Sequence, residues 1–138
     1  MAWEQPLFGL GQFKALANYS SASNQYRVVQ GSSAADTFKL LTAVDVVPLG
    51  ILQDTPAAGE AGQIAVLGVS KVRVNSTAAA AITFMQPLIA STVGGLGGVI
   101  GGSIATTNYI IGHALEAHSS ESKGIISCLL TGPSVGTT

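Results

Sequence analysis

Short apolar runs rich in β-branched residues recur along the chain, and each ends at glycine, proline, serine or asparagine. This punctuation predicts β-strands joined by turns. We expect strands at residues 26–30, 37–41, 46–52, 63–67, 69–74, 88–90, 109–115 and 124–130. Strands spaced by about 8–12 residues are typical of small sandwiches and barrels. The expected fold class is therefore all-β, as a small antiparallel β-barrel or sandwich.

The apolar pattern occurs twice. Gly50 and Gly112 define the offset, since 112 − 50 = 62, and each lies in an apolar run that ends in an acid. Three pairs of segments share this offset: 47–54 with 109–116, 62–67 with 124–129 and, more weakly, 26–29 with 88–91. We therefore expect a duplicated β unit, with pseudo-repeats at about 25–68 and 87–130, inside a single β domain of residues 25–138.

The alternation of side chains assigns faces to the repeated strands. Ile64 and Val66 are expected on one face, and Ile126 and Cys128 on the equivalent face of the second copy. Gly68 interrupts the run and predicts a bulge or bend. Because both faces of these strands are apolar, we expect both to be covered, and a second subunit is the simplest cover.

Residues 1–24 have no clear period and match neither copy. They nevertheless hold three of the five Trp and Phe residues of the chain. The large apolar side chains of this segment are Trp3, Leu7, Phe8, Phe13 and Leu16. We expect an extended N-terminal arm that uses them to contact a partner or a neighbouring subunit, and a disordered terminus is the alternative.

Charge is scarce in this chain. With 138 residues it fits one domain with its own core, yet only 9% of the residues are charged, against about 25% in ordinary domains. Such a surface predicts cover by other molecules. The net charge of −1 offers no basic stripe, so nucleic-acid binding is not expected.

A membrane-spanning helix is the alternative suggested by the uncharged stretch between Arg73 and Glu116. The glycines at 94, 95, 97, 98, 101 and 102 oppose it, because each costs a helix about 1 kcal/mol. We expect no membrane span. The first residues also lack the basic and apolar regions of a signal peptide, so none is expected.

Few residues suggest catalysis or metal binding. Cys128 is the single cysteine and is expected to be a buried apolar residue. His113 and His118 lack the further ligands that a zinc site needs. Asp54 and Glu116 occupy matching positions, where we expect them to accept backbone N–H bonds in turns.

Known catalytic motifs are missing. The glycine-rich segment 94–102 fits neither a phosphate loop nor G-x-G-x-x-G, and no G-x-S-x-G elbow occurs. We expect no enzyme, no cofactor and no metal. A hydrolase or small-molecule binder that uses Asp54, Glu116 and His113 is kept as an alternative.

Two stretches resemble a known family. Residues 49–61 read LGILQDTPAAGEA and are followed by VLGVSKV at 66–72, while residues 110–117 read IIGHALEA. They are similar to the capsid decoration, or cement, proteins of tailed bacteriophages, which are typified by G-x-L-Q-x-x-P-A-A-G and I-G-x-A-L-E-A. The resemblance covers about residues 25–131. The turn at 105–108 and the first 24 residues depart from the family pattern.

The resemblance implies a non-enzymatic virion protein that binds the outer surface of the capsid and stabilises the shell. Its implied partners are the major capsid protein and further copies of itself, as a homotrimer or a dimer. It would be made in the host cytoplasm, and Trp3, Leu7, Phe8, Phe13 and Leu16 would make the capsid or subunit contacts. The alternative is another virion module, in a tail or a fibre.

Overall fold

The computed structural model describes residues 5–75, 81–92, 97–101, 109–119 and 124–135, and it confirms the all-β prediction. Besides one short 3-10 helix, η1 (Ala22–Asn24), the regular structure of these ranges is β. The strands are β1 (Gln5–Leu10), β2 (Lys14–Ala15), β3 (Val28–Gly31), β4 (Thr37–Leu40), β5 (Pro48–Leu52), β6 (Ile64–Val74), β7 (Pro87–Ser91), β8 (Gly98–Gly101), β9 (Tyr109–Ala114) and β10 (Gly124–Val135). Strands β1, β2 and β8 were not predicted.

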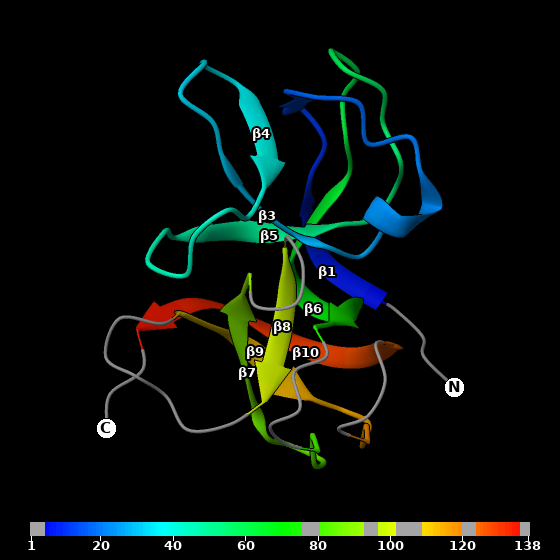
Figure 1. Cartoon of the computed structure of the whole chain (residues 1–138), viewed down its shortest axis with the longest axis vertical. Helices are drawn as coiled ribbons and strands as arrows, with labels where there is room; N and C mark the ends of the chain where they lie inside the picture. The colour runs from blue at the N-terminus through cyan, green and yellow to red at the C-terminus, as the bar shows by residue number, and fades with distance from the viewer. Residues whose placement is uncertain (1–4, 76–80, 93–96, 102–108, 120–123, 136–138) are drawn as a thin grey trace.

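The C-terminal lobe is a closed barrel, drawn in the lower half of Figure 1. The second half of β6 pairs with β10, and the ring continues through β9, β7 and β8. A parallel pairing of Val74 with Val99 joins β8 back to β6. All other pairings in this ring are antiparallel, so the ring leaves no open sheet edge between its members.

The N-terminal lobe, in the upper half of Figure 1, is built on the first half of the same strand. Here β6 pairs with β5, β5 with β3, and β3 with β4. The N-terminal segment completes the ring, because β2 lies parallel to β4 and β1 lies antiparallel to β6. The Ala15 N–H also donates to the Glu60 carbonyl at 2.8 Å. The described part of the predicted arm thus lies inside this lobe.

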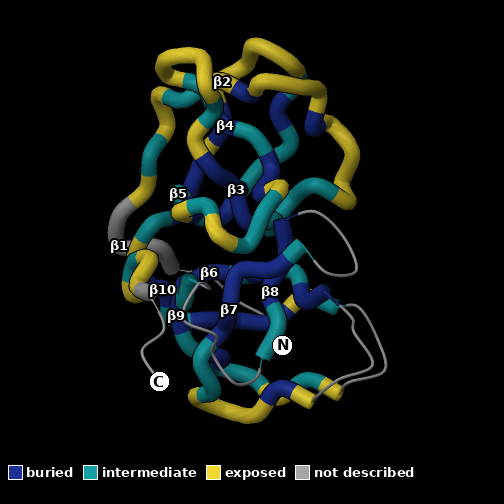
Figure 2. Tube along the Cα trace, turned by 60° about the vertical axis from the view of Figure 1, so that its left-hand side comes forward, coloured by how far each residue is buried: buried dark blue, intermediate teal, exposed yellow. Residues whose placement is uncertain are grey.

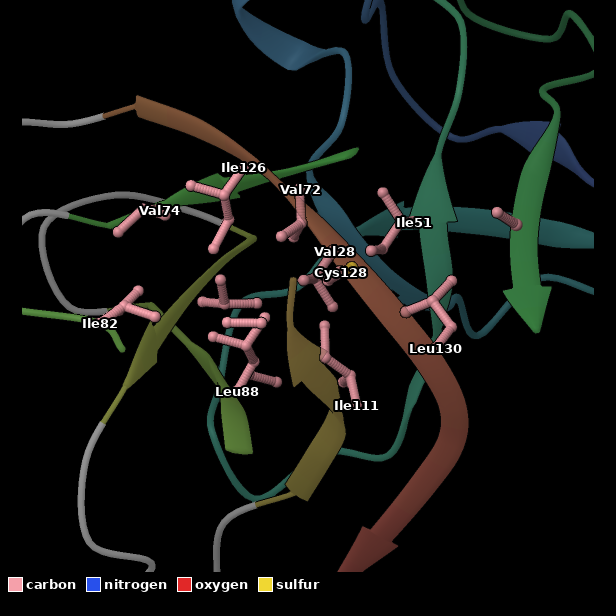
Figure 3. Packing of buried hydrophobic residues seen from close by; sticks show 14 of the residues in the cluster. Val28, Ile51, Val72, Val74, Ile82, Leu88, Ile111, Ile126, Cys128 and Leu130 are labelled. Atoms are coloured by element: carbon pink, nitrogen blue, oxygen red, sulfur yellow. The ribbon is translucent and has the colours of Figure 1, made fainter. Parts of the chain in front are cut away.

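Two hydrophobic clusters lie on opposite sides of the strands between the lobes. The larger one, shown in Figure 3, includes Val28, Ile51 and Ala65, whereas their neighbours Val29, Leu52 and Ile64 belong to the smaller one. Successive residues of β3, β5 and β6 therefore face different cores. The chain itself covers both apolar faces of these strands, so the expected cover by a second subunit is not required.

Burial along the chain follows this arrangement. Figure 2 shows buried segments through the middle of both lobes and exposed tube on the outer loops. Both clusters contain large, fully buried side chains: Phe38, Leu41, Ile51, Leu52, Ile64 and Leu88. Each such side chain contributes about 1.5–3 kcal/mol relative to exposure. The two clusters are thus the main source of stability.

The pairing pattern of the N-terminal lobe recurs in the C-terminal lobe. The order β4-β3-β5-β6 is repeated by β8-β7-β9-β10, with antiparallel pairing throughout. A bulge also recurs, since the register skips Leu49 opposite β3 and Ile111 opposite β7. Leu49 and Ile111 are 62 residues apart (111 − 49 = 62), as the sequence offset predicts.

The offset differs in the other strands. Residues with positive φ form three matching pairs: Tyr26 with Met85, Asp36 with Gly97, and Gly68 with Gly132. Their offsets are 85 − 26 = 59, 97 − 36 = 61 and 132 − 68 = 64. The predicted gapless offset of 62 therefore holds only for β5 and β9. The matches of 26–29 with 88–91 and of 62–67 with 124–129 were wrong by three and two residues, because the connecting loops differ in length.

The N-terminal segment also has a counterpart, contrary to the expectation that it matches neither copy. Ala15 lies parallel to Phe38 of β4, just as Val74 lies parallel to Val99 of β8. Lys14 bridges Ala61 in the same way that Arg73 pairs with Ile125. Residues 5–15 thus occupy in the N-terminal lobe the place that the second half of β6 occupies in the C-terminal lobe.

We predict that Gly50→Ala lowers the free energy of unfolding by about 2–3 kcal/mol. A Cβ at this position would collide with the Ala65 carbonyl oxygen on β6, and one at Gly112 would collide with the Leu129 carbonyl oxygen on β10. Backbone atoms inside a sheet cannot move aside cheaply. Chemical denaturation measures the loss. Gly31→Ala is the matched control, because its Cβ would meet nothing within 4 Å, and a comparable loss there would contradict the steric explanation.

A second prediction concerns the close contact between the Phe38 ring and Gly62. A Cβ on Gly62 would lie 2.7 Å from Cζ of the buried Phe38 ring, so Gly62→Ala should destabilise the N-terminal lobe. In the C-terminal lobe, Val99 corresponds to Phe38 and Ile126 corresponds to Gly62, and both are buried. There the residue on β8 is the smaller one and the residue on β10 is the larger one. Phe38→Val should therefore offset part of the Gly62→Ala loss. A double-mutant cycle should give a favourable coupling of about 1 kcal/mol or more, and strict additivity would refute it.

Candidate docking surface

Of the five predicted contact residues, the structure describes the side chains of Phe13 and Leu16. Trp3 lies outside the described residues, and the backbone of Leu7 and Phe8 belongs to β1, which pairs with β6. Phe13 is partly buried and packs against the smaller cluster. Leu16 is 50% exposed. The capsid or subunit contact of these residues stays a prediction.

Large exposed apolar side chains occur at several other places. Among the described residues they are Leu16, Val47, Leu67, Phe84, Met85 and Ile125. Phe84 has the largest exposed fraction of these, 66%, and its neighbour Met85 is 46% exposed. The two residues form the tip of the turn at residues 83–86, directly before β7. We call residues 83–86 the Phe84 turn.

Hydrogen bonds fix the Phe84 turn at both ends. The Gln86 N–H donates to the Thr83 carbonyl at 3.2 Å, and the Thr83 N–H donates to Oε1 of Gln86 at 2.9 Å. The Met85 N–H donates to the Ala114 carbonyl at 2.7 Å, and the Ala114 N–H donates to the Gln86 carbonyl at 2.9 Å. The turn is thereby attached to the end of β9.

The N-terminal lobe contains the same turn with different side-chain contacts. Tyr26, which corresponds to Met85, has the same positive φ, and its N–H donates to the Leu52 carbonyl at 2.7 Å. The Tyr26 ring packs against the larger cluster, and Nζ of Lys71 lies 5.3 Å from its centroid. In the first copy the large side chain of this turn, Tyr26, packs against the core, whereas in the second copy Phe84 and Met85 are both exposed. Sequence reasoning missed the Phe84 turn because the register between the copies was three residues off at this point.

Arg27 and Arg73 line a polar cavity together with Asn75. Burial, and after it the charge of Arg73, lowers the pKa of Arg27. Both side chains bond to the η1 segment: Nε of Arg27, directly before β3, donates to the Ser23 carbonyl at 2.7 Å, and Nη2 of Arg73 on β6 donates to the Ala22 carbonyl at 2.8 Å. Paired guanidinium groups can bind an oxyanion, but the bonds shown here serve the fold.

An apolar hollow lies where the two lobes meet. The lining includes Pro48, Leu49, Ile111, Leu130 and Pro133, and so comes from both copies of the unit. Val47, next to Pro48 in the chain, is 53% exposed. Polar side chains are missing from the described lining, so this part of the hollow offers apolar contact.

The single cysteine and the histidines do not form a reactive centre in the described ranges. Cys128 is fully buried, as predicted, and burial raises the pKa of its thiol to about 12. His118 packs against Gly124 and bridges Ile82 through its backbone, while His113 lies half-buried on β9. Within those ranges, no group of three or more potential metal ligands comes together. No helix of the described chain is long and apolar enough to cross a membrane.

Asp54 and Glu116 accept backbone N–H bonds, which confirms the prediction for both. The Gln63 N–H donates to Oδ1 of Asp54 at 3.1 Å, and the Ser127 N–H donates to Oε2 of Glu116 at 2.6 Å. The bond from Ser127 lowers the pKa of Glu116 more than burial raises it. Asp54 thus binds the backbone just before β6, and Glu116 binds the backbone within β10.

Neither family models nor curated proteins match the chain. Among solved structures, it is similar to the N base of head fiber gp8.5 in bacteriophage phi29. The identity is 15% and the TM-score is 0.61, and the similarity covers 94% of this chain and 98% of that chain. The two proteins share a fold over nearly their whole lengths. Membership of the decoration family stays a prediction.

We predict that Glu116→Gln lowers the free energy of unfolding at pH 7 by about 1 kcal/mol, because the Ser127 N–H binds a neutral amide more weakly than the partly buried carboxylate. Solvent screening keeps the loss this small. Because the folded-state pKa of Glu116 is depressed, the charged group stabilises the fold above its ordinary pKa. This contribution is lost as the pH falls through the folded-state pKa. Denaturation at several pH values should therefore show the variant and the wild type converging in acid. Asp45→Asn, which alters an exposed carboxylate, is the control, and a constant difference across pH would contradict the assignment.

Proposed function

We propose that this protein is a structural component of a bacteriophage virion that binds the head. The observation that carries the proposal is the shared fold with the N base of a phage head fiber, over 94% of this chain. The resemblance of residues 49–61 and 110–117 to capsid decoration proteins supports it independently. Two unrelated comparisons, one of structure and one of motifs, thus favour the same class of protein.

In finer detail, we propose a non-enzymatic decoration protein on the outer surface of the capsid, bound to the major capsid protein and stabilising the shell. The residues of the alternative enzyme hypothesis have structural uses that support this choice. Asp54 and Glu116 hold the backbone of their own lobes. The low charge content and the exposed apolar residues suit a protein that is covered in its working state.

Many weak contacts suffice for such a role. A shell presents the same surface many times, and an oligomeric binder gains avidity from several simultaneous contacts without any single strong one. We propose that the protein acts as a homotrimer or a dimer. The chain itself covers both apolar faces of β3, β5 and β6. Oligomerisation is therefore proposed as a source of avidity and not as a requirement for folding.

A fibre module is the second candidate. The solved neighbour is the base of a head fiber, which supports a base that carries a projecting structure as a second form of head attachment. The two candidates share attachment to the head and differ in whether anything extends from the protein. A tail location is the remaining form of this alternative.

The test adds purified wild-type protein to heads that lack it. We expect the protein to co-sediment with the heads at a fixed stoichiometry, and cryo-electron microscopy to show its density on the outer surface. Bound protein should also raise the temperature at which the heads release DNA. Light scattering of the free protein would give its oligomeric state. Density on tails, or the absence of the protein from purified virions, would overturn head attachment.

A further inference from the structure

We propose that the Phe84 turn is the docking element of this protein, and that Phe84 and Met85 insert into an uncharged apolar pocket on its binding partner. Under the proposed function this partner is the major capsid protein, so the identity of the partner rests on that function. The turn differs from the predicted contact residues at the N-terminus and lies on the other lobe.

Exposure is the first step of the argument. Phe84 and Met85 leave 66% and 46% of their surface in solvent, and they are adjacent at the tip of one turn. Aromatic residues and methionine are enriched in the buried centres of protein interfaces. Buried aromatic anchors also carry a large share of binding energy. A pair of this kind on an outer turn therefore suits insertion into a partner.

Preorganisation is the second step. The turn is closed by Thr83 and Gln86, and two hydrogen bonds with Ala114 attach it to β9. Thr83 Oγ1 also lies 3.4 Å from Oε1 of Gln86. A contact element that is already held in place loses less conformational entropy on binding. The exposed ring is thus presented on a fixed backbone.

Comparison of the two copies is the third step. Met85 has φ 63° and Tyr26 has φ 65°, a conformation that favours glycine or asparagine over larger side chains. In the first copy, packing of the Tyr26 ring against the core and Lys71 accounts for the large residue. In the second copy the backbone needs the same φ, yet Phe84 and Met85 project outward. The fold explains the conformation of this turn and does not explain its exposed side chains.

Charge and area identify the kind of partner. Residues 74–115 carry no formal charge, so the turn offers apolar recognition without ion pairs. Phe84 and Met85 together expose on the order of 200 Å², against the roughly 800 Å² per partner of a stable interface. A second copy held by this turn alone would dissociate. A pocket on a repeating shell, where many weak contacts act together, suits it better.

The experiment compares full-length variants for binding to heads that lack the protein. Phe84→Ser and the double variant Phe84→Ser/Met85→Ser should keep the wild-type melting curve, because neither side chain is part of the buried core. We expect head affinity to fall about tenfold or more for the double variant. Phe84→Leu should retain most of the binding. Val47→Ser, which changes an apolar residue on the other lobe whose exposed fraction lies between those of Met85 and Phe84, is the matched control and should bind as wild type.

The outcomes separate the two proposals. Full binding by the double variant, with wild type also bound, overturns the docking role of the turn and leaves head attachment standing. An equal loss in Val47→Ser also overturns it, since the effect would then be general to exposed apolar residues. A smaller oligomer for Phe84→Ser in light scattering would show that the turn binds a second copy. Wild-type protein that fails to bind heads overturns the proposed function. It also overturns the major capsid protein as the binding partner of the Phe84 turn.

Discussion

Strand β6 hydrogen-bonds to members of both lobes, and the rest of the structure depends on this double use. Its first half pairs with β5 and β1, and its second half pairs with β10 and β8. Gly68, with φ 96°, lies where the strand passes from one lobe to the other. Because neighbouring residues of β6 face different clusters, the strand contributes to both cores at once. Without β6, the sheet of each lobe would lack one of its strands.

The pattern of apolar residues was sufficient to predict most strands, the bend at Gly68 and the use of Asp54 and Glu116 as backbone acceptors. It could not give the register between the copies. Loops can gain or lose a residue without changing the apolar pattern, and a shift of two keeps every side chain on its face. The correct offsets emerged from backbone features that sequence does not display, such as the positive φ of Tyr26 and Met85.

The place of the N-terminal segment was hidden for a different reason. Lys14 and Ala15 take the positions of Arg73 and Val74 in the strand pairing. A cation followed by a small apolar residue is too common a pair to reveal this from sequence. Side-chain size is likewise distributed differently in the two cores: the large Phe38 lies against Gly62 in one lobe, and the smaller Val99 corresponds to Phe38 in the other. Residue-by-residue comparison does not detect a redistribution of this kind.

The same limit applies to the docking surface. Apolar content pointed to Trp3, Leu7, Phe8, Phe13 and Leu16, but composition cannot distinguish a residue that packs from one that projects. Phe13 packs against a core, whereas Phe84 is largely in solvent. Even in the equivalent turns of the two lobes, Tyr26 packs against the core and Phe84 is exposed. Only the folded chain separates the two cases.

The shared strand also has a consequence for vectorial synthesis on the ribosome. The ring of the N-terminal lobe cannot close until residues 64–69 have emerged, since β1 and β5 both pair with them. Once β6 has joined that ring, its second half is available to pair with β8 and β10, which both follow it in the chain. The nascent chain can therefore build the second lobe on a strand that the first has already ordered.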